Sequence, residues 1–272
     1  MQDPSKPIWF NKKTKTVEIT NKKNSFFVAT PVHSDVSIHY LQACLDFQKE
    51  CFKKDILVSF QLMKSSLVTQ GRNLCVSGFM ESNHTHLLFI DSDIDFLAES
   101  VFKMADCNKD VISVAYPLKT FNWEKGWRKI QEGKIKSVDD LRDKAFYQYP
   151  MKVANEKNII IKDGVIEVTH SPTGCMLIKR SVIERMIEAY PDKEIKQGTI
   201  INGELMDRRY FYNLFDTDFD PKTKTYLGED FAFCKRWKDI GGKCHALVTE
   251  KITHAGEHCY KGCFGDELSK SS

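Results

Sequence analysis

The chain has 272 residues, of which 42% are hydrophobic and 28% are charged, and its formal net charge is +3. This composition is ordinary for a globular protein, and the small net charge gives no indication of a nucleic-acid partner. No apolar stretch approaches the ~20 residues that a membrane-spanning helix needs, so we expect no membrane span.

The cysteine pattern indicates a reducing compartment. There are nine cysteines, an odd number, and they are scattered without a regular framework. Several lie in apolar runs, where a free thiol acts as a small hydrophobic group. The first residues, Met1–Lys6, lack the apolar core of a signal peptide. We therefore expect a cytoplasmic protein with free thiols.

The first 120 residues alternate between strand-like and helix-like segments. After a polar lead-in with a short strand at 16–19, the expected strands are 25–30, 55–62, 86–90 and 110–116, and the expected helices are 37–53, 66–82 and 97–107. Ser37 is a suitable cap for the first helix, whose apolar positions are Ile38, Leu41, Leu45 and Phe52. This alternation predicts an α/β fold with a mostly parallel central sheet flanked by helices.

The second half of the chain is less regular. Residues 121–165 are charged and aromatic and indicate an insertion or flap, and 191–227 are loop-rich. Further expected elements are strands at 165–169, 175–178 and 243–248, and helices at 181–189 and 229–240. We expect one domain over 1–272, divided into a lead-in (1–24), a nucleotide-binding half (25–120), the insertion (121–165), an acceptor and catalytic half (166–256) and a tail (257–272).

Two carboxylates, Asp91 and Asp93, follow the apolar run His86–Ile90. Side chains at i and i+2 of an extended chain point the same way, so we expect both at the tip of one buried strand. Like charges this close are costly unless a cation lies between them, and carboxylate oxygens suit Mg²⁺ or Mn²⁺. The same pattern leaves a second interpretation open, a phosphohydrolase that uses Asp91 as its nucleophile.

Three later segments carry residues of the kinds used in catalysis and binding. Glu229 and Asp230 open a helix with a strong apolar face, and a carboxylate held rigidly there can take a proton from a hydroxyl. His254 precedes small residues, and neutral imidazole is a suitable further ligand for Mn²⁺. Gly174 lies between two strands, which indicates either a hairpin or a close approach of the backbone to a ligand.

Taken together and in this order, the features resemble the GT-A superfamily of glycosyltransferases: an Asp-x-Asp motif, a Gly-containing loop, a Glu-Asp pair and a late His. The similarity is to small phage, viral and bacterial transferases and covers residues 25–256. It implies a GT-A (Rossmann-like) sheet with a loop-rich acceptor-side region. The segments that carry it are Ala29-Thr30-Pro31, Gly71-Arg72-Asn73, Asn213-Leu214-Phe215-Asp216, Tyr226-Leu227-Gly228-Glu229-Asp230, Phe233-Cys234-Lys235-Arg236-Trp237 and Gly241-Gly242.

The resemblance implies a metal-dependent transfer of a sugar from a nucleotide-diphosphate sugar, with UDP as the expected nucleotide, to a hydroxyl of a glycan or another acceptor. Asp91, Asp93 and His254 would bind Mn²⁺ or Mg²⁺. Asp230 would be the general base, with Glu229 beside it. The residues implied to bind the donor are Thr30, Pro31, Val32, Arg72, Asp91, Ser92, Asp93 and Gly174.

The acceptor is left open by the sequence. Aromatic side chains in the loop-rich segments can stack on sugar rings, but they can equally form a core for the insertion. The acidic cluster before Pro221 is interpreted more simply as a solvated turn than as a second cation site. A further interpretation is a non-catalytic module that binds a sugar or nucleotide, and a measurement of turnover would distinguish it from an enzyme. These aromatic and acidic residues are Trp123, Trp127, Tyr147, Tyr210, Phe211, Tyr212, Asp216, Asp218 and Asp220.

Overall fold

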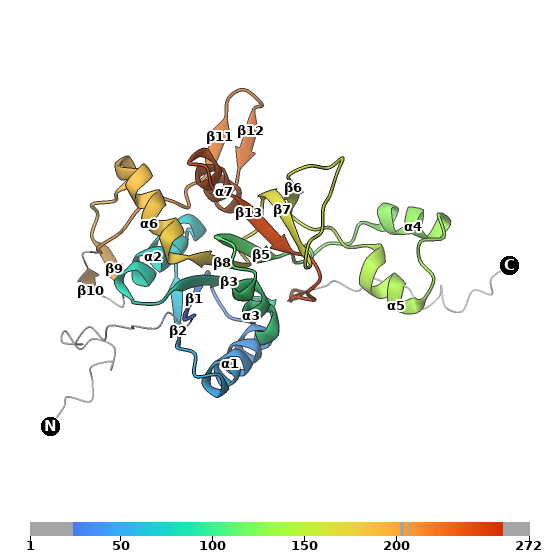
Figure 1. Ribbon diagram of the computed structural model, residues 1–272, viewed down its shortest axis with the longest axis horizontal. Coiled ribbons are helices and arrows are strands. Elements are labelled where there is room, and N and C mark those ends of the chain that lie inside the picture. Colours follow the sequence, from blue (N-terminus) through green and yellow to red (C-terminus); the bar gives the residue numbers. More distant parts are fainter. Residues whose placement is uncertain (1–23, 202–203, 207, 258–272) are drawn as a thin grey trace.

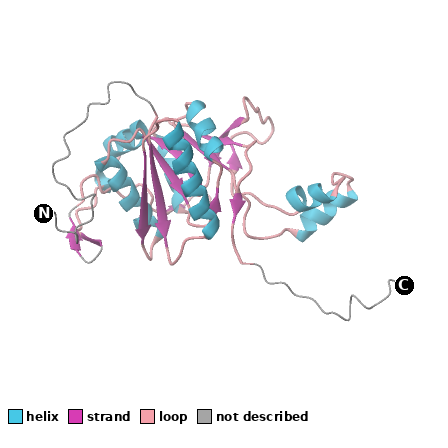
Figure 2. Ribbon diagram, turned by 90° about the horizontal axis from the view of Figure 1, so that it is seen from below, coloured by secondary structure: helices cyan, strands magenta, loops and turns pink. Residues whose placement is uncertain are grey.

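The computed structural model describes residues 24–201, 204–206 and 208–257. An eight-stranded sheet runs through these residues, with helices on both of its faces (Figure 1, Figure 2). The predicted α/β class is therefore confirmed. In spatial order the strands are β2 (Val58–Lys64), β1 (Phe26–Val32), β3 (His86–Ile90), β8 (Cys175–Lys179), β5 (Val111–Val114), β13 (Cys244–Leu247), β7 (Val165–His170) and β6 (Lys152–Val153).

The sheet is mostly parallel in direction, as predicted, but it includes two reversed strands. β1 pairs in parallel with β2 and β3, and β13 pairs in parallel with β5. β8 lies antiparallel between β3 and β5, and β7 lies antiparallel between β13 and β6. The carboxyl ends of β1, β3, β5 and β13 consequently meet at one edge, where ligands bind in sheets of this kind.

Alternate residues of each central strand point to opposite faces of the sheet, and each face has its own apolar core. Phe26 and Val28 pack with α1 and α3, whereas Phe27 and Ala29 pack with α2, α6 and α7. The α-helices of the described residues are α1 (Ile38–Lys53), α2 (Val68–Glu81), α3 (Ala98–Asp106), α4 (Trp123–Gln131), α5 (Val138–Asp140), α6 (Arg180–Ala189) and α7 (Glu229–Asp239).

Helix α1 begins as predicted, but its buried face was predicted wrongly. Ser37 is the cap, and its hydroxyl accepts a hydrogen bond from the His39 backbone N–H. The four apolar residues expected in the core are exposed, and Phe52 is 86% exposed. The helix instead buries Tyr40, Ala43, Cys44, Phe47 and Cys51. These side chains belong to the apolar core on this face of the sheet, whereas the larger aliphatic groups of α1 point outward.

Two loops differ from their simplest interpretation. The segment 171–174 joins β7 to β8, but these strands pair with different neighbours, so the hairpin alternative is wrong. The strand expected at 25–30 extends further than predicted, because β1 continues through Pro31 to Val32. The loop-rich stretches also contain short antiparallel ribbons. These are β9 (Thr199–Ile201) with β10 (Glu204–Met206), β11 (Asp218–Asp220) with β12 (Thr225–Leu227), and β4 (Ile94–Asp95) with β14 (Thr253–His254).

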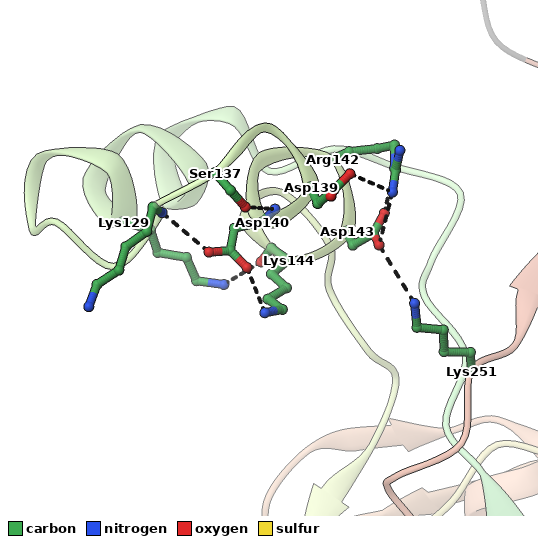
Figure 3. A network of polar contacts seen from close by, with 9 residues as sticks. Lys129, Ser137, Asp139, Asp140, Arg142, Asp143, Lys144 and Lys251 are labelled. Carbon is green, nitrogen blue, oxygen red and sulfur yellow. Dashed lines mark hydrogen bonds and ion pairs between the residues drawn. The ribbon is translucent and has the colours of Figure 1, made fainter.

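The predicted insertion is a helical arm that projects from the sheet (Figure 1). It contains α4, α5 and a π-helical turn, η2 (Leu141–Ala145). Its neck is closed by two backbone hydrogen bonds, Leu118 N–H to Gln148 O at 2.8 Å and Asn122 N–H to Phe146 O at 2.9 Å. Figure 3 shows the polar contacts within it, including the ion pair at 3.8 Å between Asp143 and Lys251, a residue of the main body.

Two further expectations concern a membrane span and the two ends of the chain. Among the described residues, no helix combines the length and the apolar character of a membrane span. The strand expected at 16–19 and the tail beyond residue 257 lie outside the described residues. The division of the chain into a single domain with two halves stays a prediction.

Candidate functional site at the carboxyl edge of the sheet

The two acidic residues after β3 lie in a turn. The N–H of Ile94 donates to the carbonyl of Asp91 at 3.1 Å, so the chain reverses directly after Ile90. The extended geometry behind the prediction that both carboxylates point the same way is therefore wrong. The carboxylates of Asp91 and Asp93 instead belong to two separate clusters, each with its own basic partner.

The first cluster is centred on Arg72, a buried arginine of α2. Its Nη2 donates to Asp91 Oδ1 at 3.0 Å, and its Nε donates to Glu229 Oε1 at 3.1 Å. Burial alone lowers the pKa of Arg72, but the charges of the two carboxylates outweigh burial and raise it. Its remaining nitrogen, Nη1, is buried and has no hydrogen-bond partner. An unpaired buried donor of this kind is costly, and a ligand oxygen placed beside Nη1 would remove that cost.

Asp230 follows Glu229 in the first turn of α7, where the helix dipole favours acidic residues. Its Oδ1 accepts a hydrogen bond from the Phe231 backbone N–H at 2.7 Å. Burial and then the negative charge of Glu229 raise the pKa of Asp230 to about 6. An acid with a pKa near neutrality is a suitable proton acceptor at physiological pH.

The second cluster joins Asp93 to His254 and Lys119. Strand β14, which contains His254, pairs with β4, and the Ala255 N–H donates to Asp93 O at 2.8 Å. His254 Nε2 consequently lies 3.5 Å from Asp93 Oδ1, and the ammonium of Lys119 pairs with Asp93 Oδ2. Burial opposes ionisation of Asp93, but hydrogen bonds from His254 and Lys119 outweigh it and lower the pKa of Asp93 to about 2.

Tyr116 separates the two clusters. Its ring centroid lies 5.0 Å from that of His254, and burial and then the charge of Asp91 raise its pKa. Its ring also packs directly against Gly174, where an added Cβ would lie 2.4 Å from the ring. Gly174 O accepts the Asp91 N–H at 3.1 Å. Only glycine fits between Tyr116 and the end of β3, which explains the residue type in this loop.

The residues expected near the nucleoside lie at the same edge of the sheet. Thr30 is fully buried, and its hydroxyl is hydrogen-bonded to the Tyr40 hydroxyl at 2.7 Å. Pro31 is half-buried and Val32 is buried. The carbonyl of Ser92 accepts the Ser37 N–H at 2.8 Å, which ties the start of α1 to the turn after β3.

The arrangement fits a divalent cation in part. In the described residues, no three His, Cys, Asp or Glu side chains are placed to hold a metal ion. His254 Nδ1 is hydrogen-bonded to Pro117 O at 2.9 Å, so Nδ1 carries a proton, and the other ring nitrogen, Nε2, faces Asp93. Mg²⁺ is commonly held by one or two carboxylates together with substrate phosphates, and of this pair Asp93 supplies one carboxylate.

Sequence analysis missed Lys119 and Tyr116. Both follow β5, whose carboxyl end lies at the same edge as the end of β3. Polar residues just beyond a predicted strand were a usable signal, because the carboxyl ends of parallel strands meet at one edge. Lys119 also lines, with His254, a cavity of about 740 Å³. The arm contributes Phe121, Tyr147 and Tyr149 to its wall.

The other candidate residues divide between core and surface. Phe211 is buried, whereas Trp123, Trp127 and Tyr210 are exposed. Asp220 accepts the Lys222 N–H at 2.9 Å in the turn of the β11–β12 ribbon, as the solvated-turn interpretation predicts.

Comparisons with known proteins give likenesses in overall structure. No family model matches the chain, and no curated protein matches it. The solved structure of A197 from STIV is 19% identical, with a TM-score of 0.46 over 86% of this chain and 87% of that one. A glycosyltransferase involved in the glycosylation of the major capsid of PBCV-1 is 9% identical, with a TM-score of 0.31 over 62% and 67%. A UDP-glucose pyrophosphorylase complexed with UDP-glucose is 7% identical, with a TM-score of 0.39 over 85% and 92%.

Proposed function

We propose that this chain is a nucleotide-sugar-dependent glycosyltransferase whose reaction takes place at the carboxyl edge of β1, β3 and β5. The observation that carries the proposal is the Arg72 cluster. It combines a buried guanidinium, fixed by Asp91 and Glu229 and left with one unpartnered nitrogen, with Asp230, an acid whose pKa is raised to about 6. The cluster thus offers a donor for a ligand oxygen next to a base of suitable strength.

The roles of the residues follow from these contacts. Arg72 Nη1 donates to an oxygen of the sugar or its diphosphate, where guanidinium geometry suits oxyanions. Asp230, ionised above about pH 6, takes the proton of the acceptor hydroxyl. The hydroxyl oxygen then bonds to the anomeric carbon, while the bond from that carbon to the diphosphate oxygen breaks and the diphosphate leaves with the electron pair. Glu229 holds Arg72 in place. The Tyr116 ring covers Gly174, so this glycine would shape the site through its contact with Tyr116 and not by contact with the sugar.

Asp93 and His254 would hold Mn²⁺ or Mg²⁺ in this scheme. Asp91, the third ligand implied by the resemblance, pairs with Arg72 in the other cluster and would not be a ligand. When bound, the cation would neutralise charge on the diphosphate leaving group. Thr30, Pro31, Val32 and Ser92 would lie against the nucleoside. Because the Thr30 hydroxyl is already paired with Tyr40, its contact with the nucleoside would be through the backbone.

The remaining parts of the proposal concern donor, acceptor and compartment. A UDP-sugar is proposed as the donor from the resemblance to GT-A enzymes, and the acceptor is a hydroxyl of a glycan or another molecule. We also propose a cytoplasmic setting, which the free thiols of the seven cysteines in the described residues support.

The test is a panel of UDP-, GDP- and dTDP-sugars incubated with the chain in Mn²⁺ or in EDTA. Release of free sugar, by slow transfer to water, is measured for the wild type and for Asp230→Asn. We expect release from one nucleotide class, dependent on Mn²⁺, and loss of at least a hundred-fold in the variant. Binding without release from any donor would favour the non-catalytic module, and release of phosphate from p-nitrophenyl phosphate would favour the phosphohydrolase.

A further inference from the structure

Helix α4 of the arm presents two tryptophans to solvent on one face. Trp123 and Trp127 are four residues apart, so their side chains lie next to each other, and they are 61% and 60% exposed. The arm packs internally through Gly126, which lies directly against the Phe146 ring. Trp123 also contacts Phe146, with ring centroids 4.8 Å apart, yet most of its surface stays in water. The pair is therefore an apolar surface patch rather than the core of the arm.

The charges around this pair are mainly basic. Residues 123–136 contain five Lys or Arg and two Glu. The ammonium groups of Lys125 and Lys129 donate to backbone carbonyls of the arm, at 3.2 and 2.6 Å, so these contacts do not neutralise their charge. In the following turn, by contrast, the carboxylate of Asp140 is neutralised by Lys144 at 2.6 Å (Figure 3). An anionic surface brought against α4 consequently meets positive charge. The basic residues of the segment are Lys125, Arg128, Lys129, Lys134 and Lys136.

We propose that the arm docks on the surface of an anionic phospholipid bilayer, with Trp123 and Trp127 inserted at the level of the headgroups. Tryptophan suits that level because its ring is apolar while its N–H can bond to water or to a headgroup. Lys and Arg beside the ring can bury their stems and direct their charged ends to lipid phosphates. The arm projects from the sheet (Figure 1), so α4 can reach a flat surface ahead of the body.

Exposed aromatic rings beside basic residues can also stack on sugar rings or on the bases of single-stranded nucleic acid. Those ligands are usually held in a cleft or a groove. Neither tryptophan lines the cavity of about 740 Å³ between the arm and the body, and both lie on a projecting helix. This geometry favours a flat partner.

The experiment measures binding of the full chain to vesicles of phosphatidylcholine with about 30% phosphatidylglycerol, and to vesicles of phosphatidylcholine alone, by sedimentation. We expect binding to the anionic vesicles that weakens with added salt, and binding at least ten-fold weaker in the double variant Trp123→Ala/Trp127→Ala. The double variant Trp123→Leu/Trp127→Leu should retain most of the affinity, because a bilayer accepts a large aliphatic side chain whereas ring stacking does not. Arg128→Gln should weaken binding about five-fold.

The matched control is the double variant Phe219→Ala/Tyr226→Ala. Phe219 and Tyr226 face each other across the β11–β12 ribbon and are 57% and 67% exposed, but their neighbours in the ribbon include Asp218 and Asp220. This variant removes a comparable exposed aromatic pair from an acidic surrounding, and it should bind the anionic vesicles as the wild type does. Thermal unfolding of each variant confirms that it is folded.

Three results would overturn the inference. One is a wild-type chain that does not bind anionic vesicles, and another is binding that is unchanged without the two tryptophans or equally reduced in the control. The third is a loss in the leucine variant as large as in the alanine variant, which would indicate stacking on rings. The vesicles contain no sugar donor, so none of these results depends on whether the chain is a transferase.

Discussion

Replacing Arg72 with Met tests the cluster on which the proposed function depends. The guanidinium is 4% exposed and makes two charge-assisted hydrogen bonds, to carboxylates that are 27% exposed for Asp91 and 17% exposed for Glu229. Removing one member of a buried ionic group typically costs 3–5 kcal/mol. Because both carboxylates retain some solvent, we expect a loss at the lower end, about 3 kcal/mol in the free energy of unfolding at pH 7.5.

The loss should exceed that of a buried arginine whose partners are neutral, since Arg72→Met leaves two carboxylates without their cation. The assay is urea unfolding of wild type and variant. The control is Arg236→Met, because Arg236 is also buried but donates to the backbone carbonyls of Leu214 and Asp216, which carry no net charge. Equal losses in Arg72→Met and Arg236→Met would refute the ionic account.

Three further predictions follow from residues of the site and of α1. The pKa of Asp230 is raised to about 6, so its protonated form is favoured in the folded state and wild-type stability falls as the pH rises through 6. Asp230→Asn should therefore raise the free energy of unfolding by about 1–2 kcal/mol at pH 8 and change it little at pH 4, and wild-type turnover should increase with pH around 6. A difference in stability between variant and wild type that is the same at both pH values contradicts this. Gly174→Ala should lower the free energy of unfolding by about 2 kcal/mol, because its Cβ would lie 2.4 Å from the Tyr116 ring, and a fully stable variant contradicts that contact. Phe47→Ala should lower the free energy of unfolding by about 3–5 kcal/mol and Leu45→Ala by under 1 kcal/mol, since Phe47 is 0% and Leu45 is 52% exposed. A larger loss for Leu45→Ala than for Phe47→Ala would mean that α1 buries the apolar residues predicted from the sequence.

Local sequence signals were sufficient for the central strands of the sheet and for the start of α1. The run before Asp91 is apolar throughout because β3 is buried on both faces, and this marks a central strand without further information. Ser37 marks the start of α1 because a side-chain oxygen satisfies a free backbone N–H there. The buried face of α1 was not predictable from apolar spacing. Tyr40 is on it, and its hydroxyl is hydrogen-bonded to Thr30 of β1, a contact that the spacing of apolar residues along the helix does not reveal.

The site was predicted as a set of residues but not as a set of contacts. Asp91, Arg72 and Glu229 were all named from motifs, yet Arg72 and Glu229 are 157 residues apart and their pairing depends on how α2 and α7 pack. The separation of Asp91 from Asp93 arises from one backbone hydrogen bond in a turn. Lys119 reaches Asp93 because Gly256 leaves space beside it, a relation between distant segments that no local pattern records.

The position of β8 has a consequence for synthesis of the chain on the ribosome. In the described residues, β5 pairs only with β8 and β13, and both follow it in the sequence after the arm. A nascent chain that has emerged only as far as residue 120 therefore exposes the free edges of β3 and β5, which can pair with other chains and aggregate. A fragment truncated at residue 120 should be insoluble unless a chaperone binds it. A soluble fragment requires at least residue 179, the end of β8.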